Sequence, residues 1–172
     1  MGGYDNYAQR AAENKQDIAV SLVFEMIGYK DDAPNTQSMP VGFDLVFPEL
    51  AEQLEENEYR ADFIAFVAEE TAFVISKSLE SYADLLGLAA YTIGLTKAQS
   101  QSPALRDLRR SDHAAFWAEG YPAIMIGDTA NFRYDAYHCT SIMDEVFLLD
   151  HDFAVDVIKT TVGPLVEELG GL

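Results

Sequence analysis

The hydrophobic positions of this chain fall into short apolar runs that are separated by segments with helical spacing. Four runs have the length and the β-branched or aromatic content of buried strands, at residues 18–24, 63–67, 88–95 and 121–126. Runs without polar alternation are typical of strands that are covered on both faces of a sheet. The pattern predicts a three-layer α/β sandwich with a mixed, mostly parallel sheet of about four strands.

The segment between the second and third runs has the clearest helical pattern. Its apolar residues Ile75, Leu79, Tyr82 and Leu86 are spaced four, three and four positions apart, and Gly87 follows as a left-handed terminator. Further helices are expected at residues 4–15, 49–58 and 111–119, and from about residue 150 onward.

Local signals set the expected ends of these elements. Ser111 is expected to cap the helix that follows it, and Pro164 to kink or restart the last helix. Residues 30–47 and 96–110 are rich in polar residues, proline or glycine and are predicted to be loops.

The charge of the chain argues against two classes of binding partner. The 172 residues carry a formal net charge of −18, which opposes binding to nucleic acid and to anionic membrane surfaces. With one cysteine and no apolar run of the ~20 residues that span a bilayer, we expect a cytoplasmic protein that folds as one domain over residues 1–172.

A few polar residues stand where a sheet can present them to a ligand. Glu25 directly follows the first apolar run, and carboxyl ends of strands border ligand crevices in α/β sheets. Asp112, His113 and His138 are further candidates for chemistry. Each of these residues also has a purely structural interpretation. The two carboxylates can serve as ion-pair or cap residues, and the two histidines as packing or loop residues.

Together these stretches resemble the second half of a co-catalytic zinc aminopeptidase, the family of bacterial leucyl aminopeptidases and glutaminyl cyclase-like proteins. The matching motifs are FEMIGY at 24–29, RSDH at 110–113 with the following FW, YPAIMIGDTANFR at 121–133, and YH at 137–138. In that family the sheet has eight strands, of which this chain would hold four.

The resemblance implies roles for individual residues. Glu25 and His138 would each bind a different zinc ion, and Tyr137 would help to stabilise the tetrahedral oxyanion. Asp112 and His113 would lie behind these groups. Two departures are that residues 139–145 do not keep the His-Thr-x-x-Asp-Thr pattern, and that Gly127 stands where a small hydroxyl residue is usual.

The family's remaining ligands and its Glu-Glu pair, which includes the general base, belong to a first half that this sequence does not contain. Catalytic zinc normally has three protein ligands, so we expect weak zinc binding, or none, by this chain alone. The expected function is a truncated, aminopeptidase-like metallopeptidase that is inactive alone and acts on peptides only when complemented.

Two alternatives stay open: a non-catalytic, self-associating remnant or split-enzyme subunit, and a small hydrolase with a metal site rebuilt from Glu25, Asp112, His113 and His138. The strand from Ile18 to Phe24 would lie at an unprotected edge of the sheet. We therefore expect either a homodimer through that edge or a second chain that supplies the missing half.

Overall fold

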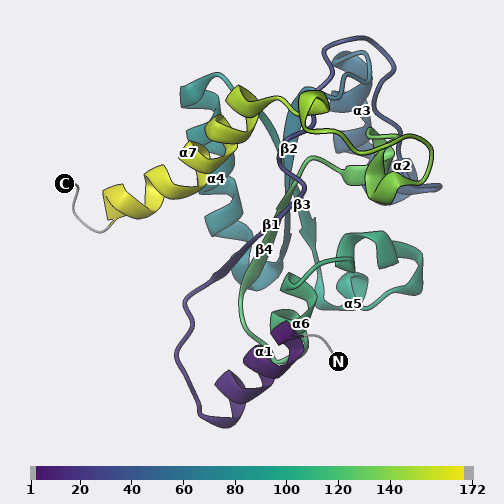
Figure 1. Cartoon of the computed structure of the whole chain (residues 1–172). Helices are drawn as coiled ribbons and strands as arrows, with labels where there is room; N and C mark the ends of the chain where they lie inside the picture. The colour runs from purple at the N-terminus through teal and green to yellow at the C-terminus, as the bar shows by residue number, and fades with distance from the viewer. Residues whose placement is uncertain (1–2, 169–172) are drawn as a thin grey trace.

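A four-stranded sheet forms the centre of the computed structural model, which describes residues 3–168 (Figure 1). Its strands are β1 (Ser21–Glu25), β2 (Phe63–Glu69), β3 (Ala89–Leu95) and β4 (Ala123–Gly127). Their order is β1-β4-β2-β3, in which β1 with β4 and β2 with β3 are parallel pairs, and β2 with β4 is antiparallel. The predicted mixed, mostly parallel sheet of about four strands is confirmed.

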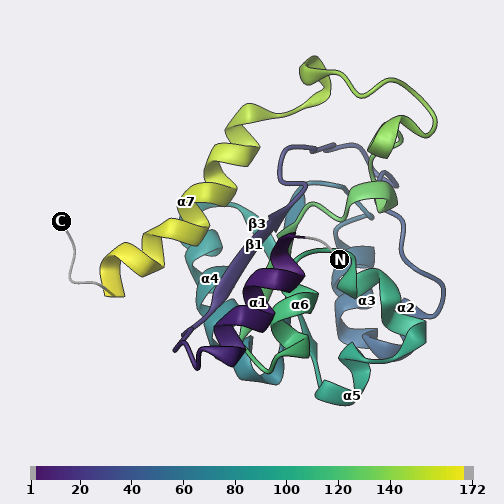
Figure 2. The same ribbon diagram turned by 60° about the horizontal axis from the view of Figure 1, so that its bottom comes forward.

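Helices cover both faces of this sheet (Figure 2). On one face lie α4 (Phe73–Leu86) and α7 (His151–Glu168), and on the other lie α1 (Gly3–Glu13), α3 (Pro48–Glu56) and α6 (His113–Ala118). Strand β2 is buried along its whole length, because its alternate side chains enter an apolar cluster on each face. The three-layer prediction is therefore confirmed.

The two predicted loops contain short helices. Residues 30–47 include α2 (Phe43–Val46), and residues 96–110 include α5 (Lys97–Ser100) and the 3₁₀ helix η2 (Pro103–Arg109). Side-chain caps explain the second case: Thr96 and Gln99 form a reciprocal capping box, and the Ser102 hydroxyl accepts from the Ala104 N–H at 3.3 Å. Because this segment is rich in polar residues, its composition predicts a loop and does not reveal these caps.

Several element ends differ from the sequence expectation. Strand β1 begins at Ser21 rather than at residue 18. Helix α6 begins at His113 with Asp112, not Ser111, at the N-cap position, and the Ser111 hydroxyl donates to Glu25 Oε2 at 2.8 Å. Helix α7 continues through Pro164 to Glu168 instead of restarting. Gly87 does end α4 in the left-handed region, at φ 73°.

A buried cation ties together the loops around the carboxyl end of β4. Arg133, only 7% exposed, donates to Gln37 Oε1 (2.8 Å) and to the carbonyl oxygens of Ala61 (3.2 Å) and Phe63 (2.8 Å). Its guanidinium carbon lies 4.4 Å from the centroid of the Phe63 ring. Burial lowers the pKa of Arg133 to about 10, opposed by the nearby Asp128, so the group remains charged at neutral pH.

We expect Arg133→Met to lower the free energy of unfolding by about 3–5 kcal/mol, because several buried acceptors lose their donor at once. Arg106→Met is the matched control: this arginine is exposed, and its loss should change stability by less than about 0.5 kcal/mol. Urea denaturation monitored by Trp117 fluorescence measures both. Equal stabilities for the two variants would contradict the role given to Arg133.

Candidate functional site

An apolar pocket opens where the carboxyl ends of β1 and β4 meet. Its volume is about 90 Å³, and it lies between the α3-side face of the sheet and the segment before α2. The wall is mostly apolar and draws on strands, helices and loops, namely Met39, Pro40, Phe43, Leu50, Leu54, Phe63, Ala65, Val67, Tyr91, Ile93, Leu108, Met125 and Phe132. A mainly apolar concavity with a few polar groups is the usual form of a small-ligand site.

The charged side chains that line the pocket do not balance. Asp107 and Arg110 form an ion pair at 3.1 Å, and Arg110 also donates to Asn131 Oδ1 at 2.6 Å. Glu25 accepts from the Ser111 hydroxyl but has no ion-pair partner among residues 3–168. The lining of the pocket therefore carries one uncompensated negative charge, which favours a cationic group on a ligand.

Gly127 lets Glu25 take this position. The two residues are partners in the β1–β4 register, and a Cβ on Gly127 would lie 2.6 Å from the Glu25 carbonyl oxygen. Any larger residue would push the end of β1 away from β4. The close approach of the two strands gives a physical reason for glycine where the resemblance leads one to expect a small hydroxyl residue.

Tyr137 and His138 follow in the 3₁₀ segment η4 (Tyr137–Cys139). Tyr137 lines the pocket, and the Arg110 guanidinium carbon lies 5.6 Å from the centroid of its ring. The His138 ring contacts the Tyr137 ring, with 4.1 Å between centroids, but it does not line the pocket. His138 has φ 55°, a left-handed conformation that turns its side chain out of the helical path.

Asp112 and His113 stand apart from the pocket. His113 is fully buried, donates from Nε2 to the Leu108 carbonyl at 3.0 Å, and packs edge-to-face on Trp117 with 4.4 Å between ring centroids. Burial lowers the pKa of His113 to about 4, so the imidazole is neutral at pH 7. Asp112 is half-buried and directly precedes α6. Of the five candidates, Glu25 and Tyr137 come together at the pocket.

These residues do not fit a zinc site by themselves. Between residues 3 and 168, no three His, Cys, Asp or Glu side chains are grouped so that they could hold a metal ion. The four-residue metal site rebuilt from Glu25, Asp112, His113 and His138 is therefore not supported. Catalytic zinc usually has three protein ligands, so a metal beside Glu25 would need ligands from outside the described residues.

The pocket also depends on residues that were not singled out in the sequence. Gln37, Met39 and Phe43 come from the segment predicted to be a loop, and Thr129 follows β4. The Thr129 hydroxyl donates to Gln37 Oε1 at 3.0 Å, the oxygen that also accepts from Arg133. A sequence signal did exist, because apolar residues in an otherwise polar loop indicate that part of the loop is buried.

The chain is similar to parts of longer known proteins. No family model matches the sequence. An Escherichia coli K12 protein, uncharacterized protein YfbL, is 30% identical over 136 residues, which are 76% of this chain and 36% of that protein. The crystal structure of Legionella pneumophila LapA aminopeptidase has a TM-score of 0.58 at 16% identity, over 99% of this chain and 36% of that one.

These likenesses show the fold of the chain and how much of each longer protein it matches. The chain spans 36% of the length of each of the two proteins. At 16% identity the match to LapA shows that the chain has an aminopeptidase-like α/β fold. Within residues 3–168, no helix is long and apolar enough to cross a membrane.

The buried, neutral His113 should make stability fall in mild acid. Its pKa in the folded state, about 4, is below the value of 6.5 expected in the unfolded chain. The stabilisation is therefore present above pH 6.5 and is lost as the pH falls toward 4, by about 3 kcal/mol in all. In His113→Phe this loss should be missing, which urea denaturation at several pH values between 7 and 4.5 measures. Parallel pH profiles for the two proteins would show that His113 titrates normally.

Proposed function

We propose that this chain provides the substrate-binding part of an aminopeptidase-like site. The pocket takes the apolar side chain of a peptide's N-terminal residue, and Glu25 pairs with its free ammonium group. The observation that carries the proposal is the uncompensated carboxylate of Glu25 in the lining of a mainly apolar pocket. The aminopeptidase-like fold supports it.

The size of the pocket favours aliphatic side chains. A dry cavity of ~150 Å³ is known to hold benzene, and this one is smaller, at about 90 Å³. Side chains of the size of leucine, valine or methionine fit better than aromatic rings. Burying such a side chain contributes about 1.5–3 kcal/mol, and a hydrogen bond to a charged group adds about 1.5–3 kcal/mol.

Hydrolysis requires more groups than the pocket provides. The described residues do not group three metal-ligating side chains, and Tyr137 is the one candidate for oxyanion stabilisation that lines the pocket. We propose that a further polypeptide segment supplies the remaining ligands and the general base, next to Glu25. Such a segment is in keeping with the greater length of the two similar proteins.

The first test is ligand binding. We expect L-leucinamide to bind with a dissociation constant in the millimolar range, on the order of −4 kcal/mol, measured by NMR chemical-shift perturbation. Glycinamide, which lacks the side chain, and N-acetyl-leucinamide, which lacks the charge, should each bind more weakly.

Glu25→Gln should weaken leucinamide binding about tenfold, as expected when one charged hydrogen bond is lost. It should leave the weak binding of N-acetyl-leucinamide unchanged. Glu119→Gln is the matched control, because Glu119 is exposed at the other end of α6. Equal affinities for leucinamide and glycinamide would refute the pocket as the side-chain site, and an unaffected Glu25→Gln variant would refute the ammonium contact.

A second test concerns metal. We expect the isolated chain to retain much less than one zinc per molecule after dialysis against a mild chelator, because too few donors meet at the pocket. Cys139→Ser controls for adventitious zinc, since this exposed thiol lies next to His138. Stoichiometric zinc in both proteins, measured by mass spectrometry, would contradict this expectation.

A further inference from the structure

The floor of the pocket belongs to the sheet. Alternate residues of β2, β3 and β4 form it, and β2 is hydrogen-bonded to a neighbouring strand along both of its edges. Two aromatic residues of this floor also support other groups. Phe63 lies edge-on to Tyr91, with 4.8 Å between ring centroids, and the guanidinium of Arg133 lies over its face. The floor therefore cannot change its shape without disturbing the sheet.

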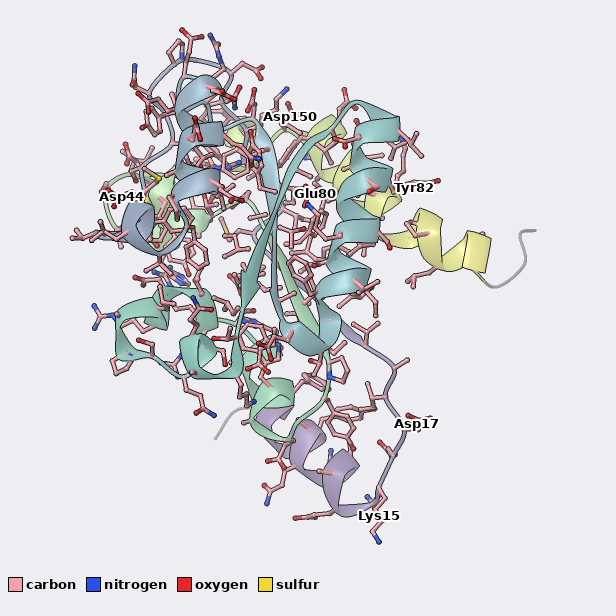
Figure 3. All side chains as sticks on the ribbon, turned by 180° about the vertical axis from the view of Figure 1, so that it is seen from behind. Lys15, Asp17, Asp44, Glu80, Tyr82 and Asp150 are labelled. Carbon is pink, nitrogen blue, oxygen red and sulfur yellow. The ribbon has the colours of Figure 1, made fainter. Side chains whose placement is uncertain are left out.

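The helix α2 is held in a different way. It is a single turn of four residues, and Phe43 is its one buried residue. Asp44, Leu45 and Val46 are exposed, and Figure 3 shows Asp44 at the outer surface of the molecule. A single helical turn is not stable by itself in water, because one hydrogen bond does not offset the cost of nucleation. The place of α2 in the fold therefore depends on the Phe43 side chain and on the connection to α3.

The outer side of this segment adds little to its stability. Val41, which precedes the helix, is fully exposed, and Leu45 is 83% exposed. The turn begins at Gly42, whose φ of 80° lies in the region that favours glycine. Segments with few buried apolar contacts open locally at a lower free-energy cost than the core does. Residues 41–46, the α2 turn, are thus an adjustable part of the pocket wall.

Phe43 is the residue through which the α2 turn reaches the pocket. Its side chain is 7% exposed, lines the pocket and belongs to the same apolar cluster as Leu54 and Phe63. The Phe47 ring lies beside it, with 5.0 Å between centroids. Phe43 thus combines a large side chain in the pocket wall with a weakly held backbone.

The volume of the pocket shows what this ring excludes. The pocket measures about 90 Å³, whereas a dry cavity known to hold benzene measures ~150 Å³. The Phe43 side chain itself ends in a ring of the size of benzene. Removing that ring would therefore add roughly the volume of one benzene molecule, which is enough for an aromatic side chain.

We infer that Phe43 is the residue that limits the pocket to aliphatic side chains, and that the α2 turn carries it as a movable wall. The inference rests on the proposed function, because it concerns which N-terminal residue of a peptide the pocket accepts. An aliphatic side chain fills the space beside the Phe43 ring and holds the α2 turn in place. An aromatic side chain meets the ring and binds only if the turn moves outward, which costs the burial of Phe43.

Binding of two amides tests the size limit. We expect the wild-type chain to bind L-leucinamide more tightly than L-phenylalaninamide, measured by NMR chemical-shift perturbation. In Phe43→Ala the ratio of the two dissociation constants should change about tenfold or more in favour of phenylalaninamide, as small changes in the fit of an apolar pocket do. Phe43→Leu should give an intermediate ratio. Leu45→Ala is the matched control, because Leu45 is exposed on the same turn and does not line the pocket, so the ratio should stay at the wild-type value.

Hydrogen exchange tests the movable wall. The Phe47 N–H donates to the Phe43 carbonyl at 2.8 Å, so the exchange rate of this amide reports on the α2 turn. Leucinamide should slow the exchange in the wild-type chain and leave it unchanged in Phe43→Ala, in which the ligand no longer contacts the ring. Slowing by the same factor in both proteins would show that the ligand holds the turn through another residue, which overturns the role of Phe43.

The outcomes separate this inference from the proposed function. Circular dichroism establishes that each variant is folded, and Phe43→Leu decides the ratio if Phe43→Ala is not. An unchanged ratio in a folded Phe43 variant that still binds leucinamide overturns the inference and leaves the proposed function standing. A wild-type chain that binds leucinamide no better than glycinamide refutes the proposed function, and the inference fails with it.

Discussion

The site depends on one buried guanidinium. Arg133 holds the carbonyl oxygens of Ala61 and Phe63 at the start of β2, and it holds Gln37 from the long segment before α2. Taking a cation out of water is costly, and these donations offset the cost only while all of the acceptors stay in place. Arg133 thus joins the loops around the pocket to the start of β2, and backbone hydrogen bonds from Gln37 to Tyr59 (2.8 Å) and from Ser38 to Phe132 (2.7 Å) hold the same segment.

The chemistry that the pocket supports follows from its charges. Asp107 and Arg110 pair with each other, so Glu25 is left as the uncompensated charge in a mostly apolar lining. An apolar group that bears a positive charge would complement this lining, which is a property of binding rather than of catalysis. The distinction matters, because fold likeness at 16% identity carries no information about catalytic groups.

The sequence predicted the framework well, and two of its candidate residues, Glu25 and Tyr137, lie in the lining of the pocket. Long apolar runs are visible in the sequence itself, so the four strands and the packing on both faces of the sheet could be predicted from it. His113 shows the limit: beside Asp112 it has the appearance of a reactive pair, but it is buried on Trp117 and donates to a backbone carbonyl. Which side of a short helix faces the core depends on tertiary packing, which local residue order does not specify. The contribution of Phe43 to the pocket was hidden for the same reason, within a segment read as a loop.

Glu25 is the last residue of β1. The direction in which another strand pairs with β1 therefore decides which end of that other strand lies beside Glu25. A parallel strand would bring its own carboxyl end beside Glu25, together with any ligands that follow it, as parallel strands do in α/β sites. An antiparallel strand would bring its amino end there instead. Only a parallel partner strand could therefore place further ligands next to Glu25.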